Sequence, residues 1–128
     1  MSRFLRLLIA LLTCLALTPI GASARPVVET NFDLYNAHLR HSPFHFAIYG
    51  RLHSPKHACI VHRRVELYFK RGDKVRLRDA GRTSRNGAIA LKDRARVHPD
   101  RFILKVRQTR IAGRLYTCGP WRWDHRLR

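Results

Sequence analysis

The apolar positions of the chain separate a leader from a body built of short alternating segments. Residues 7–20 form one charge-free apolar run. Farther along, residues 65–70 and 102–107 largely alternate between apolar and polar side chains, a period of two that indicates half-buried β-strands. Residues 44–49 are rich in aromatic and β-branched side chains and end at Gly50, which is also typical of a strand. The body is therefore predicted to be all-β.

Turn residues divide this body at short intervals. Arg71-Gly72-Asp73 predicts a turn, and Asn86-Gly87 is a strong short-range signal for a hairpin. Further breaks lie at residues 98–100 and 113. About six to seven short strands with turns between them predict a small β-sandwich, and no segment has the apolar stripe of a helix.

Residues 1–24 have the features of a cleaved signal peptide. Two arginines precede the apolar run, which is too short to anchor the chain permanently in a bilayer, and residues 22–24 (Ala-Ser-Ala) fit a signal-peptidase site. The mature protein is then expected to be secreted or periplasmic. The alternatives are a buried helix of a cytosolic domain and a lipoprotein anchored at Cys14. Thr13 is not the small residue that usually precedes a lipoprotein cysteine.

The rest of the chain is long enough for a single domain. Residues 25–43 show no clean periodicity and are predicted to form an N-terminal arm with some local structure. Residues 44–128 are predicted to form the β-sandwich domain, ending in a tail at 119–128 that is rich in tryptophan and arginine.

Cys59 and Cys118 are the two cysteines that remain after the leader. In an oxidising compartment such a pair is expected to form a disulfide, which would stabilise the fold by about 4 kcal/mol in the chain-entropy model. The alternative is a pair of free thiols that act as metal ligands or redox groups. The chain has no CxxC spacing, and this favours the structural disulfide.

The order of motifs between the two cysteines resembles secreted bacterial prealbumin-like domains, which are similar to carboxypeptidase regulatory-like and transthyretin-like modules. The motifs that carry the resemblance are Cys59, residues 63–68, residues 81–87, residues 101–106 and Cys118. Residues 83–87 match the T-[DS]-x-x-G hairpin of that family, whereas residues 98–100 (His-Pro-Asp) replace its glycine-bearing turn. The resemblance covers about half of the chain.

The resemblance implies a sandwich of about seven strands, used as a binding or structural module without catalytic residues of its own. Residues 44–52 would supply its first strand. The expected fold is thus a small immunoglobulin- or prealbumin-like β-sandwich with one disulfide.

The charge of the chain is strongly positive. Its 26 lysine and arginine residues face only eight acids, for a net charge of +18. Arginine predominates, and its planar guanidinium binds phosphate or carboxylate bidentately. Alternation along strands predicts one cationic sheet face. The predicted polyanion-binding residues are Arg76, Arg78, Arg82, Arg85, Lys105, Arg107 and Arg110. The alternative is a surface whose charge serves solubility alone.

Trp121 and Trp123 stand among basic residues in the tail. They suit a membrane interface, with the indoles at headgroup depth and the arginines on phosphates. The favoured interpretation is an edge strand that packs both rings on one face of the sandwich.

No catalytic residue, cofactor or metal site is predicted. The eight acids have no spacing that suggests an acid and base pair, and no hydrolase, metalloprotease, P-loop or dinucleotide motif occurs. Candidate metal ligands would be the histidines at 38, 41, 45, 53, 57 and 62. Their spacing requires a helix, which prolines at 43 and 55 oppose.

These observations predict an exported, noncatalytic module that associates with an anionic partner, such as lipid headgroups, polysaccharide or cell-wall phosphate. No small-molecule substrate is inferred. One alternative is a nucleic-acid-binding protein, for which Tyr68 and the two tail tryptophans are the candidate stacking residues. The other is a cationic membrane-active protein of antimicrobial or toxin type.

Overall fold

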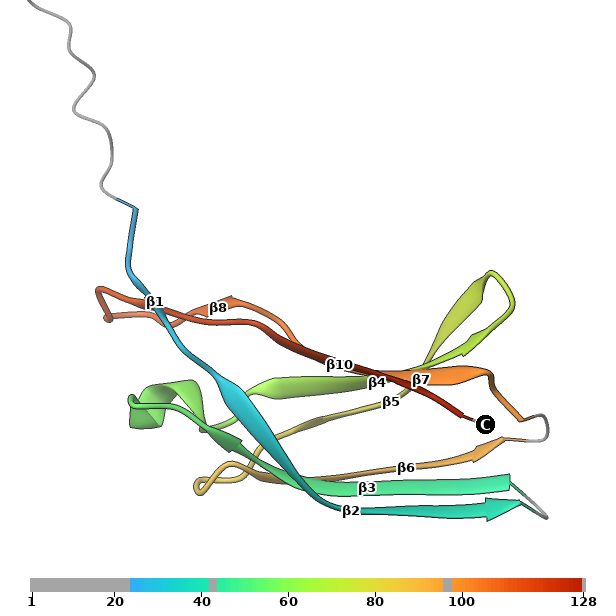
Figure 1. Ribbon diagram of the computed structural model, residues 1–128. Coiled ribbons are helices and arrows are strands. Elements are labelled where there is room, and N and C mark those ends of the chain that lie inside the picture. Colours follow the sequence, from blue (N-terminus) through green and yellow to red (C-terminus); the bar gives the residue numbers. More distant parts are fainter. Residues whose placement is uncertain (1–23, 42–43, 96–97, 128) are drawn as a thin grey trace, which may run out of the picture.

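Two antiparallel β-sheets lie face to face, and a third, small sheet lies at one end (Figure 1). The computed structural model describes residues 24–41, 44–95 and 98–127. Within these residues the predicted all-β class and the sandwich-like arrangement are confirmed. The predicted signal peptide, apart from Ala24, lies outside them. In this described part no helix is long and apolar enough to cross a membrane.

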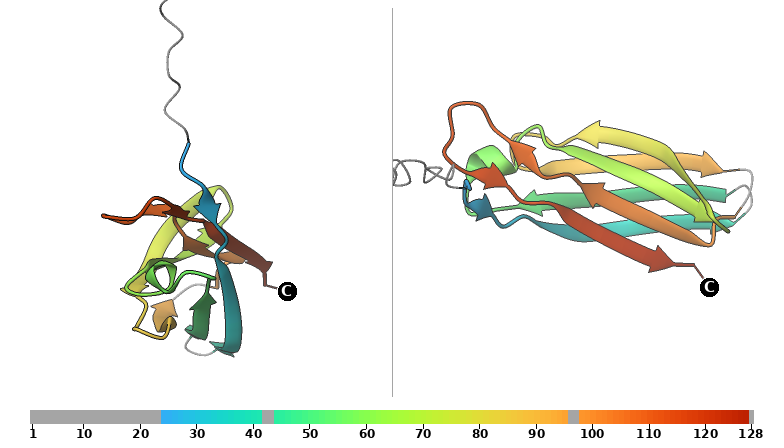
Figure 2. Two further views of the ribbon diagram at one scale, coloured as in Figure 1. Left: turned by 90° about the vertical axis from the view of Figure 1, so that its left-hand side faces the viewer. Right: turned by 90° about the horizontal axis from the view of Figure 1, so that it is seen from above.

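The four-stranded sheet is the upper layer of Figure 1. Its strands, in spatial order, are β10 (Trp121–Arg126), β7 (Arg101–Val106), β4 (Arg64–Arg71) and β5 (Lys74–Arg82). The three-stranded sheet is the lower layer, and its strands in order are β2 (Asn31–His41), β3 (Phe44–His53) and β6 (Ala88–Ala95). Every neighbouring pair in both sheets is antiparallel. The two views of Figure 2 show the layers end-on and from above.

The small sheet consists of β1 (Val27–Val28), β9 (Thr117–Cys118) and β8 (Thr109–Arg110). A short 3-10 turn, His57–Cys59, lies at the same end of the sandwich (Figure 1). This turn brings Cys59 to Cys118, and the two form the predicted disulfide with a Cα–Cα distance of 5.3 Å. Both cysteines are fully buried.

The core lies between the inner faces of the two large sheets. Alternation along β4 and β7 turns every second side chain inward, which is why the predicted apolar positions are buried. The buried core residues are Phe32, Phe46, Ile48, Leu52, Val65, Leu67, Phe69, Leu91, Phe102, Leu104 and Val106. Phe46 packs between Phe69 and Phe102, with ring centroids 5.8 and 4.4 Å away.

The two long edges of the sandwich are closed by different chemistry. On one edge Arg78 of β5 pairs with Asp93 of β6 at 2.7 Å, and the Lys92 amide donates to Asp79 at 2.8 Å. On the other edge the ring of Phe32 from β2 lies 5.2 Å from the ring of Trp121 from β10. One edge is therefore polar and the other aromatic.

The segment predicted as an N-terminal arm with some local structure, residues 25–43, contains a long strand. Residues 31–41 form β2, which pairs with β3 along its length. Leu34 and Asn36 flank an irregularity in this pairing. The bulge interrupts the alternation of side chains, and this obscured the strand in the sequence. As a result β3, which contains residues 44–52, is the second long strand of the sandwich and not the first.

The Asn86-Gly87 turn is present, but the hairpin predicted from it is not. Gly87 has a φ of +83°, and a Cβ atom there would collide with the carbonyl oxygen of Leu52. Its amide donates to Ser84 at 3.0 Å, as expected for a tight turn. The strands that it joins, β5 and β6, lie in different sheets. The local signal therefore identified the turn, whereas packing decided that the chain crosses from one sheet to the other.

Buried Arg63 holds three segments together at the disulfide end. Its guanidinium donates to the carbonyl oxygens of Cys59 at 2.9 Å, Arg107 at 2.8 Å and Gly119 at 3.0 Å. Burial lowers the pKa of this guanidinium. The three carbonyls replace the water that the buried charge has lost.

Candidate functional site

Basic side chains gather on the outer face of the four-stranded sheet, which we call the cationic face. Two acidic residues lie on the same face, Glu66 of β4 and Asp124 of β10. The strand registers place on this face the basic residues Arg64, Lys70, Arg82, Arg101, Lys105, Arg122 and Arg126, and the Glu66 ion pair adds Arg107, which follows β7. Positive charge therefore exceeds negative charge several-fold on this face.

The basic residues of the cationic face form rows across neighbouring strands. Lys70, Arg101 and Arg126 are directly opposite one another on β4, β7 and β10. Lys105 and Arg122 form a second such pair on β7 and β10. Adjacent strands lie about 4.8 Å apart. The face thus presents basic groups at short, regular intervals across the sheet.

Glu66 lies beneath these cations and is buried, with 3% of its surface exposed. The Nε atom of Arg107 is 2.6 Å from Oε1 of Glu66, and the hydroxyl of Tyr68 donates to Oε2 at 2.9 Å. Nε of Arg64 is more distant, at 3.7 Å from Oε2. Glu66 therefore anchors the cations that cover it.

The pKa of Glu66 reflects two opposing effects. Burial raises the pKa of this carboxyl, but the hydrogen bond from Tyr68 and the charge of Arg107 lower it more. The net result is a pKa below the ordinary value of 4.5, so Glu66 is ionised at neutral pH. The same contacts raise the pKa of Arg107, first through its hydrogen bond to Tyr68 and then through the charge of Glu66.

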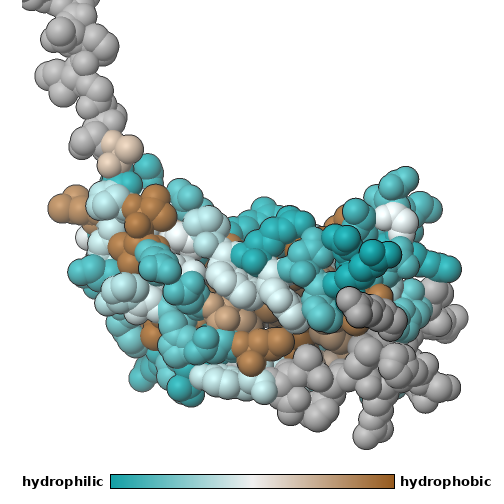
Figure 3. Space-filling model, in the orientation of Figure 1, coloured by the Kyte–Doolittle hydropathy of each residue, from teal (hydrophilic) through white to brown (hydrophobic). Residues whose placement is uncertain are grey.

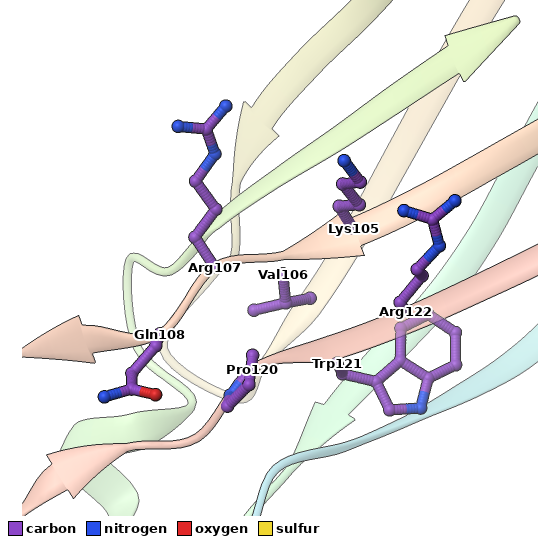
Figure 4. A pocket seen from close by; sticks show the side chains of 7 residues that line it. All are labelled: Lys105, Val106, Arg107, Gln108, Pro120, Trp121 and Arg122. Atoms are coloured by element: carbon purple, nitrogen blue, oxygen red, sulfur yellow. The ribbon is translucent and has the colours of Figure 1, made fainter.

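A hollow of about 390 Å³ lies where β7 and β10 begin to separate. In Figure 4 the side chains of Lys105, Arg107 and Arg122 extend to one side of the two strands, and Val106 and Pro120 lie below them. Lys105 also places its Nζ 5.1 Å from the ring centroid of Tyr68. The hollow therefore has an apolar base and a cationic rim.

The outline of the molecule dips above the cationic face (Figure 3). In Figure 3, which has the orientation of Figure 1, the upper outline of the molecule dips between its two ends. Hydrophilic residues cover the dip. An elongated ligand would fit into such a dip, whereas a broad, flat surface would not reach its base.

The structure brings together only part of the predicted polyanion-binding set. Arg82, Lys105 and Arg107 lie on the cationic face. The other four predicted residues lie elsewhere: Arg76 and Arg78 on the opposite side of β5, Arg85 in the turn before β6, and Arg110 on β8. Sequence reasoning missed five members of the face: Arg64, Lys70, Arg101, Arg122 and Arg126. Four of these five alternate with core residues or tryptophans on β4, β7 and β10, and that periodicity was the available signal.

A β-bulge explains the misplacement on β5. The register between β4 and β5 shifts at Tyr68, so that Leu77 lies opposite Tyr68 and Asp79 opposite Leu67. An extra residue on one strand turns the side chains beyond it to the other face. Val75 and Leu77 consequently lie on the cationic face, 49% and 47% exposed, whereas Arg78 covers the core ring of Phe69 at 5.6 Å.

Both tail tryptophans pack against the core, as the favoured interpretation predicted. β10 is an edge strand, and Trp121 and Trp123 lie opposite the inward-facing Val106 and Leu104. Trp123 contacts Phe102 at 5.2 Å between ring centroids. These contacts give both indoles a structural role in the sandwich.

In the described part of the chain, no group of three or more histidine, cysteine, aspartate or glutamate side chains lies close enough to hold a metal ion. His53 instead pairs with Asp33 at 2.9 Å, and Nε2 of His57 lies 3.0 Å from the Arg85 carbonyl oxygen. The side chains of His38 and His41 lie outside the described residues.

Comparison of the chain with protein-family models, curated proteins and solved structures finds no match.

Proposed function

We propose that this protein is an exported, noncatalytic module that binds a linear polyanion across the cationic face. The observation that carries the proposal is the pair of basic rows, Lys70-Arg101-Arg126 and Lys105-Arg122, which run across adjacent strands. A polymer lying in the concave dip would meet successive cations at the spacing of the strands. Arginine and lysine at such intervals suit repeated phosphate, sulfate or carboxylate groups.

The shape of the face favours a linear polymer over a bilayer. A flat bilayer would touch the raised ends of the outline in Figure 3 before it reached the row Lys105-Arg122 between them. The two tail tryptophans, which would anchor the protein in a membrane interface, are engaged with the core. The positive charge of the face would attract a polymer or a bilayer alike, so the shape of the face is what favours the polymer.

Other contacts support a noncatalytic, exported module. The carboxylates of Glu66, Asp79, Asp93 and Asp100 each bind a cation or a backbone amide of the fold, which gives them structural roles. The buried disulfide is typical of an oxidising compartment and supports export.

We also infer that the sandwich is of immunoglobulin type. Of the seven long strands in the described residues, the first, second and fifth form one sheet, and the other sheet has the order seventh, sixth, third, fourth. The order β2-β3-β6 corresponds to strands A-B-E of an immunoglobulin domain, and the order β10-β7-β4 corresponds to strands G-F-C. The remaining strand, β5, lies beside β4.

Charge reversal on and off the cationic face tests the proposed function. In K105E/R122E two rim cations become acids, and in the matched control R76E/R110E the same charge change occurs off the face. We expect binding of fluorescently labelled heparin to weaken about 30-fold in the first variant and much less in the control, since a basic residue near an anionic surface contributes about 1 kcal/mol. Binding by the unmodified protein should also weaken steeply with salt.

Equal losses in the two variants would mean that net charge alone decides binding, and this would refute the cationic face as a site. R101E/R126E, at the other end of the face, provides a second reversal if K105E/R122E fails to fold. In the second arm of the experiment, binding of the protein to vesicles of anionic phospholipid is measured. Binding to vesicles without binding to heparin would replace the polymer with a bilayer.

A further inference from the structure

A second hollow, of about 410 Å³, lies on the outer face of the three-stranded sheet. Two cross-strand pairs build it: Tyr49 of β3 lies opposite Ala90 of β6, and Arg51 lies opposite Ala88. Each pair sets a large side chain beside a small one, so the alanines form a floor and the larger residues form a wall. Tyr35 of β2 also lines the hollow.

Tyr35 projects from the sheet because it occupies the bulge of β2. The ladder with β3 pairs Leu34 with Gly50 and Asn36 with Tyr49, and Tyr35 between them has no opposite residue. Bulges redirect side chains and are common beside functional sites. The Tyr35 side chain is 60% exposed, an unusual position for an aromatic ring that contributes nothing to the core.

Basic groups accompany both tyrosine rings. The Cζ atom of Arg51 is 5.9 Å from the ring centroid of Tyr35, and Nζ of Lys92 is 5.8 Å from that of Tyr49. Asp33, opposite Arg51 on β2, pairs with His53 at 2.9 Å. The hollow therefore combines two aromatic rings with the guanidinium of Arg51, and Lys92 lies beside it, next to the ring of Tyr49.

The lining of this hollow suits a flat aromatic ring better than a sugar ring. Besides the guanidinium of Arg51 and the two tyrosine hydroxyls, its side chains are apolar. A sugar would bring several hydroxyl groups to a surface with few partners, and each unpaired polar group is costly. A nucleobase presents two π faces, which stack on aromatic rings whatever the base.

We propose that this hollow is a stacking site for the bases of single-stranded nucleic acid, with Tyr35 and Tyr49 as the stacking residues and Arg51 and Lys92 beside the phosphates. The site is independent of the proposed function, because it lies on the opposite sheet from the cationic face. It also replaces the stacking residues that the sequence suggested. Tyr68 donates its hydroxyl to buried Glu66, and the tail tryptophans pack on the core.

The test compares a single-stranded DNA oligonucleotide with an abasic oligonucleotide of equal length, which has the same phosphates and no bases. We expect the full-length protein to bind the DNA about tenfold more tightly than the abasic strand. Y35A and Y49A should each remove most of this preference, and Y35F should keep it because the ring remains. Y116A is the matched control, since Tyr116 also lies beside a lysine, with Lys56 Nζ 5.6 Å from its ring, but at the disulfide end.

Any of three results with the oligonucleotides would overturn the stacking site: equal affinity for the two strands, an equal loss for both strands in Y35A, or the same loss in Y116A. A loss of heparin binding in Y35A would point to a polysaccharide in the hollow and would likewise overturn it. Failure of the charge reversals on the cationic face leaves the base preference untouched, so the two proposals fail separately.

Discussion

At the scale of single residues, two buried charges organise one end of the molecule. Arg63 is surrounded by backbone carbonyls, and Glu66 lies under the side chains of Arg107 and Tyr68. Alternation of apolar and polar residues does not predict that these two charges are buried, because the residues that surround them are distant in the sequence. Arg63 precedes β4, and the backbone of Arg107 accepts one of its hydrogen bonds.

Removing the Arg63 side chain should destabilise the fold. The change R63A leaves three carbonyl oxygens without their donor, and we expect the free energy of unfolding to fall by about 3 kcal/mol. Urea denaturation with the disulfide intact measures the change. R64A is the control: its side chain is exposed and its contact with Glu66 is long, at 3.7 Å, so its effect should stay below about 1 kcal/mol. Equal effects of R63A and R64A would contradict this role.

Glu66 predicts a pH dependence of stability. Its pKa in the folded state lies below the ordinary value of 4.5, so its ionised form stabilises the fold above that pH. This contribution is lost as the pH falls through the folded-state pKa. We expect E66Q to be less stable than the unmodified protein by about 1 kcal/mol at pH 7, and the difference to shrink as the pH falls below 4.5. Urea unfolding at several pH values checks this, and a difference that stays constant would exclude the mechanism.

At the scale of elements, the strands followed from local pattern, but their faces and partners did not. β4 and β7 were identified because apolar and polar residues alternate along them, and β3 was identified because it is rich in aromatic and β-branched residues. β2 was missed, and part of β5 was assigned to the wrong face, because each contains a bulge. A bulge is a property of two paired strands, and a single strand does not reveal it. The sequence therefore predicted a sheet face rich in basic residues but named less than half of the residues that form it.

The β5 bulge can be tested by comparing two leucines on paired strands. Leu67 of β4 is fully buried, whereas Leu77 of β5 is 47% exposed. We expect L67A to lower the free energy of unfolding by about 3 kcal/mol and L77A by less than about 1 kcal/mol. Thermal or urea unfolding measures both. A cost for L77A as large as that for L67A would place Leu77 in the core and remove the bulge.

At the scale of the whole molecule, the disulfide joins two segments that are 59 residues apart in sequence, at the end where the small sheet lies. The absence of a CxxC spacing and the expected oxidising compartment predicted this bond. Its burial and its proximity to Arg63, which bonds the Cys59 carbonyl, were not predictable, because both depend on how the loops pack.

Loss of this disulfide should cost about 4 kcal/mol, because the unfolded chain regains the freedom that the closed loop removed. The double change C59S/C118S tests this in urea denaturation, with the unmodified, oxidised protein as the reference. The unmodified protein should also yield no free thiol from this pair when denatured without reductant. Two titratable thiols from the pair would contradict the bond.

The contrast between the two long edges has a mechanical consequence. Opening the sandwich on one side breaks the Arg78–Asp93 pair, and opening it on the other separates Phe32 from Trp121. Salts that are excluded from protein surfaces weaken the first contact by screening and strengthen the second by favouring apolar burial. We therefore expect concentrated salt to favour parting of the sheets at the polar edge, between β5 and β6, with the aromatic edge as the hinge.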